Sequence, residues 1–377
     1  MILSEEQTMI RDMARDFAAN RLAPNSAAWE QAAAIPKDVF DEMGALGLMG
    51  MTVPEAYGGA ETDFISYALA LMEIAGGDGA ISTVMSVNNS PCCAALLKDG
   101  TEAQKQEHLV PLAKGEMIGA FCLTEPQAGS DASALKTKAV KDGDDYIING
   151  TKQFITSGKI GGVALVFAVT DPEAGKKGIS CFIVPTNADG YRVASVENKL
   201  GQKASDTCQI TFEDVRVPAS NMLGAEGAGY RIALANLETG RIGIGAQSVG
   251  MAAAALQHAI DYAQERETFG QPIMAHQAVG FRLADMATKI EVARQMVLHA
   301  ASLKDAGVPC LTEASMAKLF ASEMAEEVCS AAIQTFGGNG YIADYPVEKI
   351  YRDVRVCQIY EGTSDIQKLV IVRNLMA

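Results

Sequence analysis

Hydrophobic residues recur at helical spacing along the first part of the chain. Behind Ser4 and Gln7, which fit a helix-capping box, apolar positions fall three or four residues apart as far as Phe17. The same pattern recurs in three further stretches, at about 38–48, 62–76 and 102–114. We therefore expect a helical domain over residues 1–116.

Short runs of β-branched and aromatic residues replace the helical pattern after this domain. Segments such as ISCFIVPT and TCQITFEDVRVP alternate with Gly, Asp, Asn and Pro, as strands separated by turns do. We expect a β domain over residues 117–224. Asn149-Gly150 and the stretch from Asp142 to Asp145 indicate hairpins or loops within it.

Long alanine-rich stretches return from Gly227 onward. One of them, EASMAKLFASEMAEEVCSAAIQTF, is too long and too helix-prone for a strand. We expect a bundle of about four long helices over residues 225–377. The order helical, β, helical predicts an α+β fold with segregated units rather than alternating strands and helices.

The charge balance limits the expected partners and location. The chain carries 31 Lys and Arg against 46 Asp and Glu, a formal net charge of −15, so nucleic acid is not an expected partner. Glu5 and Glu6 stand where an export signal would carry positive charge. No stretch approaches the roughly 18 apolar residues of a membrane span. We expect no membrane span and a cytoplasmic location of bacterial type, or the inside of an organelle after processing.

Several common catalytic and metal-binding patterns are missing from the sequence. The eight cysteines form no C-x-x-C pair and the four histidines no H-x-x-x-H pair, so we expect no metal site. Near-matches to the dinucleotide-binding fingerprint begin at Gly77 and Gly243, but each ends in Ser and neither follows an expected strand. A nucleotide cofactor would therefore have to be held in another way.

Two segments of the β domain combine apolar strand residues with hydroxyl groups. FCLTEPQAGSDASAL begins at Phe121 and breaks into a loop with Thr124 and Ser130, and KQFITSG repeats the combination with Phe154 and Thr156. A planar ring that needs an apolar face and hydrogen bonds to its heteroatoms would fit between them. Ordinary strand-to-turn junctions would contain the same residue types.

Three segments of the C-terminal domain offer groups that suit a nucleotide or an acid–base reaction. Arg266 suits a pyrophosphate, Phe269 suits stacking, and Gly337-Gly338 permits close approach of the backbone. A solvated Arg–Glu pair and a helix C-cap would account for the same residues. In YEGTSDIQ, Glu361 precedes a glycine and two small hydroxyl side chains.

The four motifs TEPQAGSD, RETFGQPI, QTFGGNGY and YEGTSDIQ together make the chain resemble the acyl-CoA dehydrogenase family over essentially its whole length. They occur in the family's order and at its spacing, and the chain looks most like the short-chain and short branched-chain members. The resemblance implies an N-terminal helical domain, a middle β-barrel domain and a C-terminal four-helix bundle. It also implies one non-covalently bound FAD per subunit and a homotetramer built as a dimer of dimers.

By this resemblance, Glu361 is the catalytic base that removes the α-proton of an acyl-CoA thioester. The β-hydrogen leaves as hydride to flavin N5, which yields a trans-2-enoyl-CoA, and an electron-transferring flavoprotein then accepts the electrons. The family stabilises the developing charge on the thioester oxygen with the N–H of Glu361 and an FAD ribityl hydroxyl. Exclusion of water by the acyl chain raises the pKa of the base.

The family's other contacts carry over to further positions of the chain. The residues expected to contact the flavin part of FAD are Phe121, Leu123, Thr124, Ser130, Phe154, Thr156, Thr363 and Asp365. The residues expected to hold the adenosine diphosphate half, largely from a neighbouring subunit, are Arg266, Thr268, Phe269, His276, Gln277, Gln334, Gly337 and Gly338. The residues expected to contact the thioester or pantetheine are Ser130, Glu238, Arg241 and Gly362.

Some positions depart from the family's pattern. Phe154 stands where many members have Trp, and Asp365 replaces a common Glu or Gln. Some members carry the base on a long helix, at the position of Gly240 in this chain. Glu238 lies two residues earlier, which turns its side chain by about 200° on a helix, so Glu361 remains the expected base.

Competing functions on the same fold are an acyl-CoA oxidase and a flavin monooxygenase, in which oxygen reaches the reduced flavin. A non-catalytic acyl-CoA-binding protein is a third alternative. Oxidases are generally longer, monooxygenases generally lack a base like Glu361, and the intact Glu361-Gly362-Thr363 disfavours a non-catalytic role. Dehydrogenation of short or branched acyl-CoA thioesters is therefore the main hypothesis.

Overall fold

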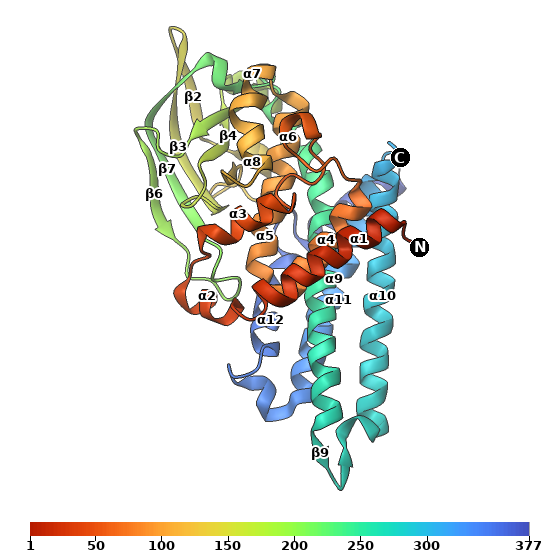
Figure 1. Cartoon of the computed structure of the whole chain (residues 1–377). Coiled ribbons are helices and arrows are strands. Elements are labelled where there is room, and N and C mark those ends of the chain that lie inside the picture. Colours follow the sequence, from red (N-terminus) through yellow and green to blue (C-terminus); the bar gives the residue numbers. More distant parts are fainter. Residues whose placement is uncertain (377) are drawn as a thin grey trace.

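Three units follow one another along the chain in the computed structural model, which describes residues 1–376 (Figure 1). A group of helices comes first, a β-sheet second and a bundle of long helices last. The first strand begins at Gly119, and the long helix that opens the last unit begins at Gly229. The expected α+β fold class is confirmed.

The N-terminal unit is built from short and medium helices. They are α1 (Glu5–Phe17), α2 (Ser26–Ala32), α3 (Lys37–Ala45), α4 (Phe64–Gly77), α5 (Gly79–Val87), α6 (Ala94–Asp99), α7 (Glu102–Gln104) and α8 (Val110–Ala113). Ser4 caps α1 as expected, because its Oγ accepts a hydrogen bond from the Gln7 N–H at 3.1 Å. The single helix expected at 102–114 is instead interrupted by a π-helical segment, η4 (Lys105–Leu109).

Helix α5 has no polar face that a helical period could reveal. Its residues from Gly79 to Ser86 are all buried. Its start is fixed by Asp78, whose Oδ1 accepts a hydrogen bond from the Ile81 N–H at 2.9 Å. Helix α5 therefore lies in the interior, between the other two units and the rest of the N-terminal helices.

The middle unit is a mixed sheet with one buried layer of side chains on each face. Its strands are β1 (Gly119–Cys122), β2 (Lys138–Asp142), β3 (Asp145–Thr156), β4 (Val163–Val169), β5 (Ile179–Pro185), β6 (Tyr191–Val196), β7 (Thr207–Pro218) and β8 (Met222–Leu223). The strand order is β6-β7-β3-β2-β4-β5-β8, and β1 pairs in parallel with β4. Within the described residues the two end strands, β6 and β8, do not pair, so the expected barrel is not closed by hydrogen bonds.

The two hairpin signals within the sheet have different outcomes. The stretch from Asp142 to Asp145 forms the turn between β2 and β3. Asn149-Gly150 is not a turn, because both residues lie inside β3 at a shift of its register with β7. A Cβ on Gly150 would come within 2.4 Å of Thr137 Oγ1, so the glycine allows the segment before β2 to approach.

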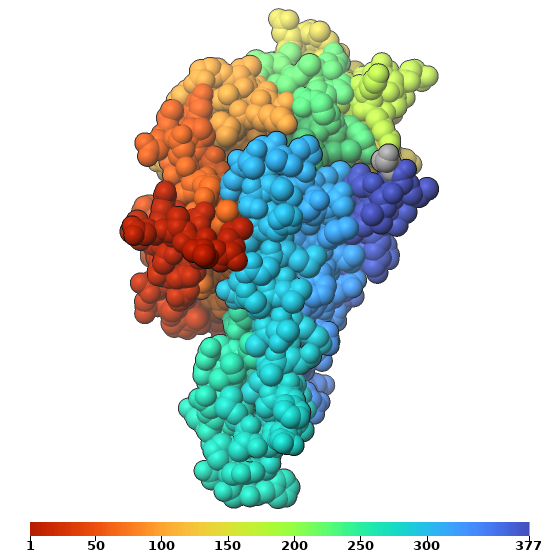
Figure 2. Space-filling model, turned by 90° about the vertical axis from the view of Figure 1, so that its right-hand side faces the viewer, coloured from red at the N-terminus to blue at the C-terminus, as the bar shows by residue number. Residues whose placement is uncertain are grey.

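The C-terminal unit contains three long helices and two shorter ones within the described residues. They are α9 (Gly229–Glu265), α10 (Gln277–Asp305), α11 (Leu311–Phe336), α12 (Val347–Val354) and α13 (Ser364–Leu375). The short strands β9 (Glu267–Thr268) and β10 (Gln271–Pro272) join α9 to α10 at the tip of a narrow extension (Figure 2). None of the helices in residues 1–376 has the length and apolar character needed to cross a membrane.

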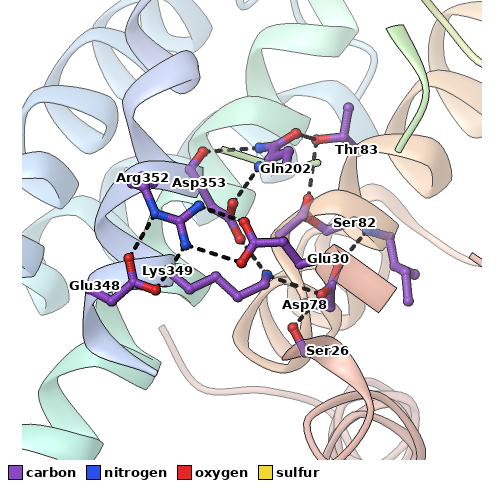
Figure 3. Close-up of polar contacts among 12 residues, drawn as sticks. Ser26, Glu30, Asp78, Ser82, Thr83, Gln202, Glu348, Lys349, Arg352 and Asp353 are labelled. Carbon is purple, nitrogen blue, oxygen red and sulfur yellow. Dashed lines mark hydrogen bonds and ion pairs between the residues drawn. The ribbon is translucent and has the colours of Figure 1, made fainter. Parts of the chain in front are cut away.

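A buried polar network joins the three units (Figure 3). Lys349 of α12 places its Nζ 2.6 Å from Asp353 Oδ2 and 3.2 Å from Asp78 Oδ2 at the start of α5. Gln202, in the loop before β7, donates a hydrogen bond to the Asp353 carbonyl at 3.1 Å and accepts one from Thr83 Oγ1 at 2.7 Å. The network therefore fixes the sheet and α12 to the end of α5, close to the loop that contains Glu361.

Candidate active site

The segment YEGTSDIQ forms a tight loop after η10 (Arg355–Gln358) as far as Thr363, and its remaining residues begin α13. Glu361 and Gly362 both have positive φ angles, 50° and 95°. Thr363 caps α13, because its Oγ1 accepts a hydrogen bond from the Ile366 N–H at 3.3 Å. Gln367 Nε2 donates to the Gly362 carbonyl at 2.9 Å. A left-handed Glu held by these contacts is a local strain of the kind that functional sites retain.

The carboxylate of Glu361 lies against α9 at Gly240. A Cβ on Gly240 would stand only 1.9 Å from Glu361 Oε2, so the glycine makes the room that the carboxylate occupies. Oε2 is buried and has no hydrogen-bond partner in residues 1–376, although the residue as a whole keeps some accessible surface. The site thus presents a partly desolvated carboxylate on a residue that is not fully buried.

Burial raises the pKa of Glu361 to about 7, while the positive charges of Lys318 and Arg241 act in the opposite direction. A carboxyl group with such a pKa exchanges its proton near neutral pH, whereas an ordinary glutamate stays ionised there. This property suits a general base that must take a proton from carbon.

Arg241 follows Gly240 on α9 and is only 7% exposed. Its Nε and Nη1 atoms make no hydrogen bond to the described residues. Burial lowers the pKa of Arg241, and the charges of Glu361 and Glu238 raise it. Burying guanidinium donors without hydrogen-bond partners costs free energy, so these nitrogens indicate a polar ligand group or water beside Glu361.

Glu238 faces a different part of the molecule. Its Oε1 accepts a hydrogen bond from Cys310 Sγ at 3.9 Å, at the start of α11. Glu361 occupies the space in front of Gly240, in agreement with the expected rotation of about 200° between Gly240 and Glu238. The geometry thus leaves Glu361 as the acid beside Gly240.

The two β-domain segments expected at the flavin lie side by side. The Gln153 N–H donates a hydrogen bond to the Thr124 carbonyl at 2.9 Å, which ties β3 to the segment after β1. Phe121 packs against Phe167 with ring centroids 4.8 Å apart. Phe154, by contrast, has a φ of 58° and a ring that is 64% exposed. The structure therefore brings Phe121, Leu123, Thr124, Phe154 and Thr156 into one region, and Ser130 lies in the exposed loop that follows.

A buried ion pair that the sequence reasoning missed supports this region. Lys152 Nζ lies 2.7 Å from Glu125 Oε1 and donates to the Leu123 carbonyl at 3.0 Å. Glu125 also accepts hydrogen bonds from the N–H groups of Lys136 and Thr137, at 2.6 and 2.9 Å. These contacts lower the pKa of Glu125 to about 2, against the effect of burial. The pair fixes the backbone on which Leu123 and Thr124 stand.

The residues expected at the adenosine diphosphate half gather at the far tip of the C-terminal unit. Phe269 has a φ of 52° and is 96% exposed. His276 contacts the Thr268 hydroxyl at 3.3 Å and its ring meets Phe269 edge-on at 6.0 Å, so it shapes the β9–β10 turn. The other residues expected here are all exposed: Arg266, Gln277, Gln334, Gly337 and Gly338.

A single chain does not bring the two halves of the expected cofactor site together. Gly240 lies on α9 and Arg266 directly follows the end of this helix, so at a rise of about 1.5 Å per residue they are about 40 Å apart. Figure 1 shows the β9–β10 tip at the opposite end of the molecule from the sheet. Thr363 and Asp365, at the start of α13, lie with Glu361 rather than with the tip.

Family models cover nearly the whole chain in three consecutive parts. The acyl-CoA dehydrogenase N-terminal domain matches residues 4–116, the middle domain residues 120–215 and the C-terminal domain residues 227–376. These ranges correspond to the three units of the structure. The expected three-domain fold of this family is therefore confirmed.

Two similar proteins are named as acyl-CoA dehydrogenases. One, from Bacillus subtilis, is 48% identical over 100% of this chain and 99% of its own length. The other, a short-chain specific acyl-CoA dehydrogenase of Clostridium acetobutylicum, is 45% identical over 98% of this chain and 97% of its own length.

Solved structures show the same likeness across the whole chain. Butyryl-CoA dehydrogenase of Megasphaera elsdenii is 41% identical with a TM-score of 0.98 and covers 100% of both chains. A chain solved in work on the electron transferring flavoprotein of Acidaminococcus fermentans is 46% identical, with a TM-score of 0.98 and coverage of 100% and 99%. Glutaryl-CoA dehydrogenase of Mycobacterium smegmatis, in complex with FADH2, is 34% identical, with a TM-score of 0.94 and coverage of 99% and 95%. Sequence, fold and domain order agree, and the chain belongs to the acyl-CoA dehydrogenase family.

Proposed function

We propose that this acyl-CoA dehydrogenase oxidises short acyl-CoA thioesters to trans-2-enoyl-CoA with Glu361 as the base. The observation that carries the proposal is the buried Glu361 carboxylate, with a pKa of about 7, lodged against Gly240. Removal of an α-proton needs a base that is free of bound water and ionised at the working pH. The buried Oε2 atom, which has no hydrogen-bond partner in residues 1–376, and the raised pKa of Glu361 support this role.

The chain's own groups suit the handling of the thioester. The N–H of Glu361 donates no hydrogen bond to another of residues 1–376, so it is available to a thioester carbonyl as negative charge develops there. Gly362 has no side chain to obstruct that approach. Arg241, with two buried and unpartnered nitrogens beside Glu361, offers further donors to a polar part of the substrate.

Members of the family are FAD-dependent, and the bound flavin would accept the β-hydride. The residues present fit such a group. Phe154 offers an exposed ring beside the Thr124 backbone, and Ser364 has a buried Oγ without a partner near the Glu361 loop. Phe121, Leu123, Thr124, Ser130, Phe154, Thr156, Thr363 and Asp365 would hold the flavin half.

We further propose that a second copy of the chain completes each cofactor site, within a homotetramer. The exposed groups at the β9–β10 tip and at the end of α11 are too far from the sheet to serve the same cofactor in one chain. Open space surrounds a Cβ placed on either Gly337 or Gly338, which suits close approach of another molecule. Arg266, Thr268, Phe269, His276, Gln277 and Gln334 would then serve a neighbouring subunit's adenosine diphosphate group.

The proposed preference for short chains rests on the relatives, which include a short-chain specific enzyme and a butyryl-CoA dehydrogenase. The proposed electron acceptor is an electron-transferring flavoprotein, because a chain 46% identical to this one was solved in work on such a protein. Both assignments are finer than family membership alone.

A direct test is anaerobic bleaching of the flavin absorbance by a panel of acyl-CoA thioesters. We expect rapid bleaching by butyryl-CoA and slower bleaching by octanoyl-CoA, with isobutyryl- and 2-methylbutyryl-CoA as the branched comparison. Glu361→Gln should keep its yellow colour and resist bleaching. A colourless protein that takes up no FAD would refute the cofactor assignment, and rapid oxygen consumption without an added acceptor would indicate an oxidase instead.

A further inference from the structure

Lys318 is a completely buried lysine in the middle of α11, at 0% exposure. Its neighbours one turn away on the helix are also buried, namely Ala314, Ser315, Ala321 and Ser322. No carboxylate of residues 1–376 lies within ion-pair distance of its Nζ. An ammonium group is among the least favourable groups to bury unpaired, so its retention among small buried side chains needs an explanation.

The hydrogen bond that Lys318 makes does not by itself explain the burial. Nζ donates to the Gly362 carbonyl at 2.8 Å, directly after Glu361 in the chain. The same carbonyl accepts a second hydrogen bond from Gln367 Nε2 at 2.9 Å. Removal of Lys318 would therefore leave the carbonyl satisfied, and what would be lost is a positive charge beside the catalytic loop.

The groups that face Glu361 come from several elements. Arg241 on α9 and Lys318 on α11 are cationic, and both favour the ionised form of Glu361. The phenol of Tyr67 on α4, near Glu361, and the thiol of Cys357 in η10, near Lys318, are buried. Burial raises the pKa of each, so both stay neutral at pH 7. Burial lowers the pKa of Lys318 to about 8, against the effects of Cys357 and Glu361, so it is mostly charged at neutral pH. Glu238 is turned toward Cys310.

We propose that Lys318 is a positioning residue for the base: its buried ammonium holds the Gly362 peptide and stabilises the ionised form of Glu361. The proposal deepens the proposed function and rests on Glu361 acting as the base. Arg241 remains available to a ligand, because its Nε and Nη1 atoms have no hydrogen-bond partner in residues 1–376. Lys318 is 0% exposed and its Nζ donates to the Gly362 carbonyl, which leaves Glu361 and its loop as the partners of its charge.

The test compares Lys318→Met, Lys318→Gln and Lys318→Arg in the FAD-loaded enzyme. For each variant, kcat/KM and the anaerobic rate of flavin reduction are measured over about four pH units, from about pH 5.5 to about pH 9.5. A nearby buried charge moves a carboxyl pKa by about 1 unit or more, so Lys318→Met and Lys318→Gln should shift the acidic limb upward and lose about fivefold in kcat/KM at pH 7. Both variants should return to within about twofold of the wild type on the alkaline plateau, and Lys318→Arg should keep the wild-type limb.

The controls separate a charge effect from a packing effect and from failure of the proposed function. Lys37→Met, at an exposed lysine of α3, should leave the profile unchanged. Unaltered acidic limbs in Lys318→Met and Lys318→Gln would overturn the proposal, as would equal shifts in all three Lys318 variants. If Lys318→Met does not retain FAD, Lys318→Gln and Lys318→Arg give the same comparison. Full activity of Glu361→Gln would instead refute the base assignment on which the proposal rests.

Discussion

At the scale of single residues, Glu361 has a raised pKa and a carboxyl group that can accept a proton, and experiments can test these two properties separately. Its pKa of about 7 in the folded chain exceeds the ordinary value of 4.5, because the carboxyl is buried. Replacement by Gln removes the proton acceptor but keeps the shape, so dehydrogenation should fall by several orders of magnitude while FAD and substrate still bind. The wild-type kcat/KM should rise with pH, with an apparent pKa near 7, since only the ionised carboxyl accepts a proton.

The same group should make stability depend on pH. A carboxyl whose pKa is raised by folding favours the folded state below about pH 4.5, and this contribution is lost as pH rises through about 7. Glu361→Gln should therefore raise the free energy of unfolding at pH 8, by at most about 3 kcal/mol, and change it little at pH 5. Urea unfolding at the two pH values measures this. An equal effect at both would contradict the assigned pKa.

The position of the carboxylate of Glu361, the proposed base, also depends on Gly240. A methyl group there would overlap Glu361 Oε2, so Gly240→Ala should displace the carboxylate and lower kcat by about 100-fold. The matched control is Gly76→Ala in α4, where the nearest heavy atom to a new Cβ is 3.6 Å away. Stopped-flow flavin reduction compares the two variants. A fully active Gly240→Ala would show that Glu361 does not need the position described here.

Motifs identify the residues that touch ligands better than the residues that support them. Glu361 is recognisable because YEGTSDIQ is contiguous. Glu125 and Lys152 are separated by 27 positions, and only the sheet brings them together. Lys318 could have been noticed, since it is a charged residue among the small alanine and serine residues of a long helix. Its proximity to Gly362 is a tertiary contact that no local pattern contains.

At the scale of elements, periodicity succeeds where one face of an element is buried and the other is solvated. Helix α1 is such an element, and its capping box is present as expected. Helix α5 is buried nearly all round, so it has no period to detect. Asn149-Gly150 has the composition of a turn, but the glycine serves close approach of Thr137 inside a strand. In these places tertiary packing overrides the local signal.

The Lys152–Glu125 pair provides a test of the strands that are proposed to contact the flavin. Lys152→Met would leave Glu125 buried without its cation and release the Leu123 carbonyl, so it should reduce stability by about 3–5 kcal/mol and weaken FAD binding. The double variant Glu125→Gln/Lys152→Met should recover part of the stability, because no uncompensated charge remains. Chemical unfolding and flavin fluorescence titration measure the two effects. Lys138→Met, at an exposed lysine of β2, is the control, and a Lys152→Met protein that matches it would refute the role of the pair.

At the scale of the whole molecule, the three units act as one body around Glu361. Asp78, Gln202 and Lys349 connect the N-terminal helices, the sheet and α12 through buried contacts (Figure 3). The neighbouring Tyr360 donates a hydrogen bond to Gln247 of α9 at 3.2 Å. Glu361, the proposed base, therefore lies where all three units meet, which explains why its surroundings could not be derived from any one segment of the sequence.

The β9–β10 tip is the part of the molecule whose proposed role depends on another copy of the chain. Phe269 makes little contact within its own chain, so Phe269→Ala should leave the intrinsic stability of the subunit within about 0.5 kcal/mol of the wild type. If the tip serves a neighbouring subunit's cofactor, the same change should weaken FAD binding at least about tenfold, since loss of an aromatic stacking partner is worth about 1.4 kcal/mol. Titration of the apoprotein with FAD measures the FAD affinity, and light scattering measures the mass in solution. Ile2→Ala is the control at another exposed apolar residue. A monomer that binds FAD with undiminished affinity after the substitution would assign the whole cofactor site to one chain and remove the need for a partner.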